Sequence, residues 1–307
     1  MNLRALLLRL HRWAALIFAL PLLAIILSGL VLSIEPLAQK APPASPLSRE
    51  TVLGWLDRFD PQKKATGLAL RTYDQTLTIT GVGEDGAIDV SLASGVLTEE
   101  DGFAEWFGLA RGLHERLLLD LGWLVTASTV AMLLLVGLGL AMGWPRLRNT
   151  LGGWHAGIAW IGLPLIVLSP LTGLLIAAGV TLSGPSVSPR GERIPVRDAV
   201  EAIAARQDLA GLTSLRTRGG RMIARIYEGG RLTNYVVTRD GVQPAPSNWP
   251  RALHEGNWNA FFGSFLNVVL SFALIGLWGT GLIIWARRRF RRRRPSRRLS
   301  PATAASR

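Results

Sequence analysis

The chain has 307 residues, of which 49% are hydrophobic and only 18% are charged, yet its formal net charge is +13. This combination argues against a water-soluble protein and favours a membrane protein, in which apolar residues form spans and basic residues lie in loops. The chain contains no cysteine. That absence excludes disulfides, thiolate metal sites, iron–sulfur clusters and covalently attached c-type haem.

Four apolar stretches without a charged side chain are long enough to cross a bilayer, which takes about 20 residues. They are residues 13–34, 121–144, 156–182 and 261–286. We expect the first to be a retained helix, because its apolar run exceeds the ~7–15 residues of a signal-peptide core. Cleavage as a signal peptide is the alternative, because residues 38–44 are rich in alanine. The sequence therefore predicts four transmembrane helices.

The charges that flank these stretches predict their orientation. The N-terminus, the connection 145–155 and the tail 287–307 together carry 15 basic and no acidic residues, whereas loop 35–120 has a net charge of −6 and loop 183–260 of +4. Positive charge collects on the cytoplasmic side, so we expect both termini to be cytoplasmic and both large loops to lie outside. We interpret the arginine-rich tail as an anchor to anionic membrane lipid and not as a nucleic-acid site.

The sequence repeats at a spacing of 140–144 residues. Arg111-Gly-Leu-His114-Glu115 matches Arg251-Ala-Leu-His254-Glu255, and His11 and His155 each precede an apolar span that carries Leu-Pro. We expect two units in the same orientation, each with an extracytoplasmic domain between two spans. The predicted order is 1–34 (N-terminus and first span), 35–116 (domain 1), 117–144 (second span), 145–155 (cytoplasmic loop), 156–182 (third span), 183–256 (domain 2), 257–286 (fourth span) and 287–307 (basic tail).

Both extracytoplasmic domains show the pattern of small α+β modules. In the first, helical spacing covers residues 48–59, with Ser48 as the N-cap, and strand-like runs cover 67–73, 75–81 and 87–92. In the second, a helix is expected at 196–206 and a hairpin at 222–227 and 232–238.

All four histidines of the chain flank a predicted span. The topology places His11 and His155 at the inner edge and His114 and His254 at the outer edge, so each repeat contributes one histidine to each face. Four unrelated interfacial histidines are the alternative. A haem needs only two axial ligands from the protein, and we therefore expect two bis-histidine b-type haems, His11 with His155 and His114 with His254. Ligands on opposite faces lie ~30 Å apart and cannot share an iron.

Other residues are compatible with haem without requiring it. Arg111 and Arg251, three residues before the outer histidines, could pair with haem propionates or simply lie at the interface. Six glycines near the inner ends of the second and fourth spans would either leave room for a macrocycle or allow close helix packing. They are Gly137, Gly139, Gly143, Gly276, Gly279 and Gly281.

Several short motifs resemble the PepSY-associated transmembrane helix family. They are Leu10-His11-Arg12-Trp13 with Ser28-Gly29, Trp154-His155-Ala156-Gly157 with Leu171-Thr172-Gly173, and the two Arg-x-Leu-His-Glu segments. The resemblance covers nearly the whole chain except the basic tail, and residues 196–243 are similar to PepSY modules. Members of that family include inner-membrane iron-uptake proteins, some of them haem-containing reductases of ferric siderophores. The resemblance implies that the protein lies in a bacterial inner membrane, that the four histidines match the family's haem ligands and that the outer domains shape a periplasmic site.

We therefore expect a haem-dependent oxidoreductase that carries electrons across the membrane to a ferric siderophore or another ferric chelate. The cytoplasmic segments are too short for a flavin or nicotinamide domain, so the electron donor would be a membrane quinol or a separate dehydrogenase. The alternative is a non-redox PepSY membrane protein that binds, senses or inhibits an extracytoplasmic partner. A transporter of iron chelates is disfavoured because no span contains a charged residue or a sign of a broken helix other than Pro21, Pro164 and Pro170.

Overall fold

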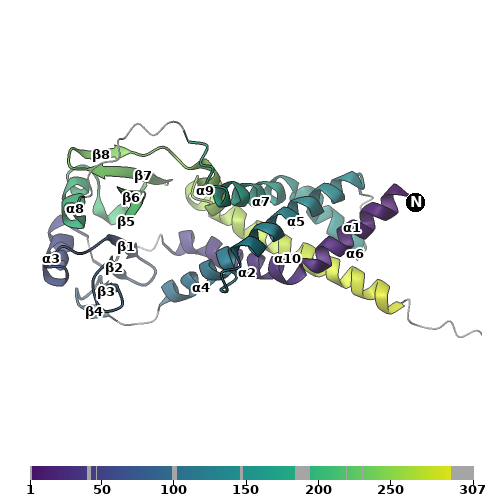
Figure 1. Ribbon diagram of the computed structural model, residues 1–307, viewed down its shortest axis with the longest axis horizontal. Coiled ribbons are helices and arrows are strands. Elements are labelled where there is room, and N and C mark those ends of the chain that lie inside the picture. Colours follow the sequence, from purple (N-terminus) through teal and green to yellow (C-terminus); the bar gives the residue numbers. More distant parts are fainter. Residues whose placement is uncertain are drawn as a thin grey trace, which may run out of the picture.

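The protein is elongated, with a bundle of helices at one end and a β-sheet at the other (Figure 1). The computed structural model describes residues 2–39, 43–45, 47–98, 102–145, 148–183, 194–218, 220–229 and 231–291. The end of the basic tail, residues 292–307, lies outside the described residues. The N-terminus lies at the end of the bundle that is farthest from the sheet (Figure 1).

Six of the described helices form the bundle, and all of them except the amphipathic α1 are mainly apolar. They are α1 (Leu3–Ile17), α2 (Ala19–Ala38), α5 (Gly122–Ala141), α6 (Leu151–Ile161), α7 (Leu163–Ala177) and α10 (Ala260–Arg291). Of the described helices, α2, α5 and α10 are each long and apolar enough to cross a membrane, and α6 with α7 makes a fourth if this pair, bent by 64°, crosses as one span. The protein is therefore of the helical membrane type.

The first and third spans are broken, where the sequence predicts continuous helices. The breaks lie at Phe18 and Gly162, each shortly before a proline, Pro21 or Pro164. A proline cannot donate to the carbonyl four residues back and its ring clashes with that carbonyl. The segments before the breaks, α1 and α6, become separate helices, and these two helices carry His11 and His155.

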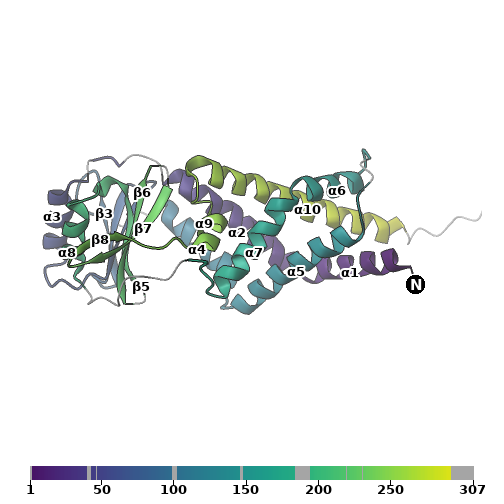
Figure 2. The same ribbon diagram turned by 90° about the horizontal axis from the view of Figure 1, so that it is seen from above.

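Two short helices that the sequence did not predict join the sheet to the bundle. They are α4 (Phe103–Arg116) and α9 (Trp249–Glu255), and each ends at a residue with left-handed backbone, Leu117 and Gly256 respectively. These helices carry His114 and His254 and lie between the sheet and the bundle (Figures 1 and 2). The outer histidines therefore belong to short helices of their own and not to the starts of spans.

The two expected α+β domains share one antiparallel sheet of eight strands, in the order β4-β3-β2-β1-β5-β6-β7-β8. The first repeat supplies β1 (Gly67–Arg71), β2 (Thr76–Thr80), β3 (Ala87–Ser91) and β4 (Leu97–Thr98); the second supplies β5 (Leu212–Arg218), β6 (Arg221–Glu228), β7 (Arg231–Thr238) and β8 (Gly241–Pro244). The halves join where Leu68 pairs with Leu215. Gly67 is required there, because a Cβ would lie 2.6 Å from the Leu215 carbonyl oxygen.

Helices α3 (Arg49–Phe59) and α8 (Val196–Ala204) cover the face of the sheet that is turned away from the bundle (Figure 2). The expected cap of α3 is confirmed, since the Ser48 side chain accepts from the Thr51 N–H. Buried residues of both repeats form one hydrophobic core beneath these helices, including Leu77, Ile79, Ile203 and Leu215. The opposite face of the sheet is turned towards the membrane helices.

Candidate functional site: two facing pairs of histidines

The inner pair consists of His11 on α1 and His155 on α6, at the end of the bundle far from the sheet (Figure 1). The centroids of their rings are 6.5 Å apart, and the ring planes are nearly perpendicular, at 87°. The two residues are 144 positions apart in the sequence, and α1 and α6, which carry them, both contact α10.

The outer pair consists of His114 on α4 and His254 on α9. Their ring centroids are 6.0 Å apart, with an angle of 49° between the planes. Helix α4 packs on α2, and α9 packs on α7. The structure thus brings together the two pairs that the topology and the repeat had suggested, while haem ligation by these pairs stays a prediction.

Hydrogen bonds from neighbouring helices hold all four rings through the same atom, Nδ1. In the inner pair, Nδ1 of His11 lies 3.2 Å from the Leu135 carbonyl oxygen, and Nδ1 of His155 lies 2.9 Å from the Thr280 hydroxyl oxygen. The Thr280 hydroxyl donates to the Gly276 carbonyl at 2.6 Å, so towards His155 its oxygen acts as the acceptor. Both inner rings therefore donate from Nδ1.

The outer pair repeats this arrangement. Nδ1 of His114 lies 3.0 Å from the Ile25 carbonyl and 3.2 Å from the Ser28 hydroxyl. Nδ1 of His254 lies 3.1 Å from the Ser169 carbonyl and 3.2 Å from the Thr172 hydroxyl. Ser28 and Thr172 occupy equivalent positions of the repeat, and sequence reasoning gave them no role. Ser28 and Thr172 are 144 residues apart, the same spacing as between His11 and His155, and this spacing could have identified them as equivalent residues of the repeat.

These contacts determine which ring nitrogen can bind a ligand. A carbonyl oxygen can only accept, so the proton of each neutral ring sits on Nδ1 and the lone pair sits on Nε2. No hydrogen bond within the described part of the chain engages Nε2 of any of the four rings. Ligating histidines characteristically donate the other N–H in this way, which sets their tautomer and ring orientation.

The donor set fits a haem better than a bare metal ion. The described residues contain no group of three or more His, Cys, Asp or Glu side chains placed to hold a metal, whereas a porphyrin needs only two axial ligands. Two metal–imidazole bonds of about 2 Å each, extended by the rings themselves, place the ring centroids roughly 6 Å apart. Both observed separations, 6.5 and 6.0 Å, agree with that spacing.

The inner glycines contribute little to helix packing. A Cβ added at Gly137, Gly139, Gly143 or Gly279 would meet no heavy atom within 4 Å among the described residues, and one added at Gly276 would meet only Ile158, at 3.7 Å. Gly281 faces the His155 ring, with 3.5 Å between its Cβ position and Cε1. Of the six, Gly281 is the one that lies against a histidine of the inner pair among the described residues, and room for a macrocycle beside the others stays a prediction.

The two pairs are closer together along the bundle than the sequence suggested. On the continuous helix α10, Asn267 donates to the His254 carbonyl, and Thr280 accepts from His155. These anchors are thirteen residues apart, which corresponds to about 20 Å of helix. This length is shorter than the expected ~30 Å, because the outer rings lie beside Ile25 and Ser28, which are near the middle of α2 and not at its end.

Arg111 and Arg251 are engaged with carboxylates. Arg111 Nη2 lies 2.5 Å from Glu35 Oε2 at the outer end of α2, and Arg251 Nη1 lies 2.8 Å from Glu255 Oε1. The sheet adds Arg225, whose Nη2 lies 3.2 Å from Glu255 Oε2 and which sequence reasoning missed. Burial raises the pKa of the Glu255 carboxyl, but the two arginines outweigh this effect and leave that pKa below its usual value.

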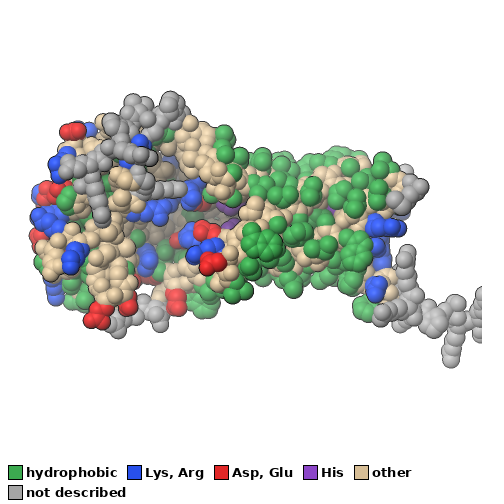
Figure 3. Space-filling model, viewed as in Figure 1, with side chains coloured by type: hydrophobic (Ala, Val, Ile, Leu, Met, Phe, Trp, Pro, Cys, Tyr) green, Lys and Arg blue, Asp and Glu red, His purple; other side chains and the backbone are tan. Residues whose placement is uncertain are grey.

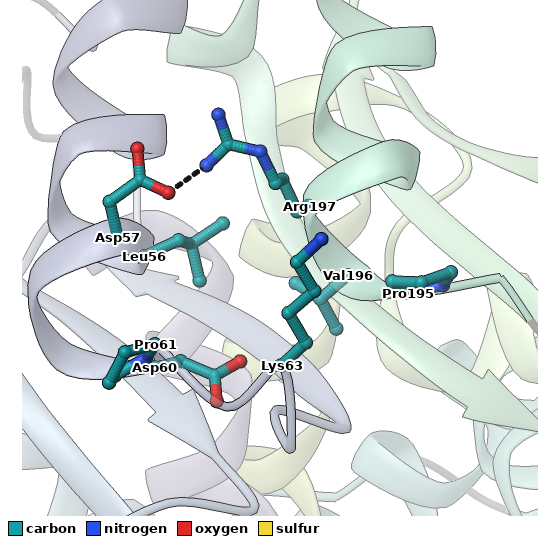
Figure 4. Close-up of a pocket in the computed structure, with 8 residues that line it drawn as sticks. All are labelled: Leu56, Asp57, Asp60, Pro61, Lys63, Pro195, Val196 and Arg197. Atoms are coloured by element: carbon teal, nitrogen blue, oxygen red, sulfur yellow. Dashed lines mark hydrogen bonds and ion pairs between the residues drawn. The ribbon is translucent and has the colours of Figure 1, made fainter.

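A hollow separates the open face of the sheet from the bundle. Lys and Arg side chains line its wall, and histidine is visible at its edge towards the bundle (Figure 3). A pocket of about 30 Å³ lies between α3 and α8 on the far side of the sheet. There Arg197 pairs with Asp57 across the two repeats (Figure 4). That pocket is far from the histidines, whereas the hollow borders the outer pair (Figure 3).

Comparison with known proteins supports one assignment. A family profile described as the PepSY-associated TM region matches residues 8–288, a stretch that includes all four histidines and the whole sheet. None of the curated proteins compared with the chain matches it significantly.

Proposed function

The chain belongs to the family of the PepSY-associated TM region, and from this premise we propose that it is a transmembrane electron carrier with two bis-histidine b-type haems. His11 and His155 would hold the inner haem, and His114 and His254 the outer one. The electron acceptor would be a ferric siderophore or another ferric chelate outside the membrane. The donor would be a membrane quinol or a separate dehydrogenase.

The observation that carries the proposal is that all four imidazole rings are paired and hydrogen-bonded in the same way. Every histidine of the chain faces a second histidine, and every Nδ1 donates to a neighbouring helix. Incidental interfacial histidines have no reason to share one tautomer and one pairing distance. This regularity favours paired axial ligation over the non-redox alternative.

In this role the protein binds and orients the haems, and the haems supply the redox chemistry. A bound haem would exchange one electron at its iron, with a potential set by the axial ligands, hydrogen bonding and burial. The carbonyls of Leu135, Ile25 and Ser169 and the hydroxyl of Thr280 hold the imidazoles in position. The apolar bundle keeps water from the ligands, and the hollow below the sheet admits the acceptor to the outer pair (Figure 3).

Optical spectroscopy of purified protein tests this function. We expect a Soret band, α and β bands that sharpen on reduction with dithionite, and two haems per chain. His155→Ala should remove one haem and retain the outer one, and His254→Ala should do the converse. A colourless preparation from haem-replete cells would contradict the proposal, and retention of both haems in these variants would contradict the ligand assignment.

A further inference from the structure

Helix α10 runs along the bundle from the outer histidine pair to the inner end (Figures 1 and 2), and one of its side chains bonds to the break in the first span. The indole N–H of Trp278 donates to the Ala19 carbonyl at 2.8 Å. Ala19 is the first residue of α2 and directly follows Phe18, where the span is broken. The hydrogen bond therefore links the last helix of the second repeat to the break in the first repeat.

The place of Trp278 in the sequence is unusual for a membrane helix. Tryptophan in such helices is enriched at the interface with water, whereas Trp278 lies nine residues, or roughly 14 Å of helix, before Arg287. The first repeat has no equivalent: Gly137 matches Gly279 at a spacing of 142 residues, and at the same spacing Trp278 matches Val136. An indole N–H that is removed from water usually finds an acceptor, and here the acceptor is the backbone at the break.

The angle at the break determines where His11 lies. Pro21 cannot donate to the Ile17 carbonyl, so the backbone at the break lacks one of the hydrogen bonds of a continuous helix. His11 is eight residues before Ala19, or about 12 Å along the helix. At that distance a rotation of about 5° at the break would move His11 by roughly 1 Å. Metal–ligand distances are normally kept within about 0.2 Å, so a small rotation is enough to disturb ligation by His11.

We propose that Trp278 is a positioning residue for the inner haem, an inference that rests on the proposed function. Its hydrogen bond fixes the angle at the break and thereby holds the His11 ring nearly perpendicular to the His155 ring, at 87°. The outer rings are inclined by 49°. The angle between two imidazole planes determines how the iron d orbitals split, and the EPR spectrum of an oxidised bis-histidine haem reports that splitting. The inner haem should therefore give the signal with the larger maximum g value.

Trp278→Phe tests this role, because it keeps an aromatic ring and removes the N–H. EPR of the oxidised full chain in lipid nanodiscs should show two low-spin signals, of which the inner one is lost in His155→Ala. In Trp278→Phe the inner signal should broaden and move to a smaller maximum g value, and the outer signal should not change. Titration of the apo-protein with haem should show roughly tenfold weaker binding at the inner site, the low end of the 10- to 100-fold cost of losing a partner that orients a ligand.

Trp123→Phe is the matched control, since Trp123 is an exposed tryptophan at the start of α5, and it should behave like the wild type. If Trp278→Phe does not fold, benzothienylalanine at Trp278, which has sulfur in place of the N–H, serves for the same measurements. The proposal is overturned if the inner signal and the inner affinity stay as in the wild type, if both haem sites change alike, or if Trp123→Phe has the same effect. A wild type without a Soret band refutes the proposed function, whereas a wild type with both haems and no response to Trp278→Phe refutes the positioning role alone.

Discussion

At the scale of single residues, the decisive feature is the hydrogen bond that each imidazole donates from Nδ1. The partner is a helix carbonyl for His11, His114 and His254, and the hydroxyl of Thr280 for His155. A carbonyl of the backbone cannot be removed by substitution, but the hydroxyl of Thr280 can. His155 is therefore the ligand whose orientation can be tested without altering the ligand itself.

Thr280→Val should weaken retention of the inner haem by about 10- to 100-fold, the usual cost of losing a partner that orients a metal ligand. The outer haem should be unaffected, and Thr280→Ser should restore binding because it keeps the hydroxyl. Titration of the apo-protein with haem, followed at the Soret band, measures the effect.

Thr129→Val provides the control, since the Thr129 hydroxyl bonds only the Val125 carbonyl of its own helix, α5. If Thr280→Val and Thr129→Val bind haem equally, the hydroxyl has no positioning role.

At the scale of elements, the four histidines lie on helices that are separate from the long spans. Breaks in the first and third spans create α1 and α6, and the short helices α4 and α9 carry the outer pair. Helix α4 begins at Gly102, which has no side chain to cap it, and Asp74 from the turn between β1 and β2 takes over this role. Its two carboxylate oxygens accept from the N–H groups of Phe103 and Ala104, both at 2.8 Å. Gly102 permits this approach, because a Cβ there would lie 2.5 Å from Asp74 Cγ.

Asp74→Ala should lower the free energy of unfolding by about 1 kcal/mol, the typical cost of losing a helix N-cap. Asp74→Asn should lose less, since its amide oxygen still accepts one hydrogen bond. Thermal unfolding in detergent, followed by circular dichroism, measures the difference. Glu105→Ala removes an exposed carboxylate from the first turn of the same helix and is the control; an equal loss in both variants would contradict capping by Asp74.

At the scale of the whole molecule, the sheet and the inner histidines lie at opposite ends of the long axis. Helices α1 and α6, which carry the inner histidines, lie at the end far from the sheet (Figure 1). The 15 basic residues of the two termini and the connection 145–155 have no acidic counterpart in these segments. Because such charge is retained in the cytoplasm, we expect the sheet and the hollow to face outward.

Single cysteines introduced into this cysteine-free chain test the orientation. In spheroplasts, a membrane-impermeant maleimide should label Glu84→Cys, in the turn between β2 and β3, and should leave Asn149→Cys, in the connection between α5 and α6, unlabelled until lysis. Both positions are exposed, so access to the reagent depends on the side of the membrane. The reverse pattern would show that the charge argument is wrong for this protein.

Local patterns were sufficient for several elements and insufficient for others. The helix over 48–59 and the hairpin of β6 and β7 follow from side-chain periodicity and turn residues, which act within a few positions. The pairing of β1 with β5 joins residues nearly 150 positions apart, and Arg225 reaches Glu255 across the gap between sheet and helix. Such contacts leave little local pattern in the sequence.

The sequence by itself determined the membrane class, the predicted orientation and the grouping of four histidines into two pairs, because hydropathy, charge and repeat spacing are linear properties of the chain. Only the tertiary structure decided that the two outer halves share one sheet, that each imidazole donates from Nδ1, and that Arg225 joins the outer site. Those features depend on which atoms of distant segments come within hydrogen-bonding distance. The tertiary packing of the helices and the sheet decides which distant atoms meet, and local sequence patterns do not reveal it.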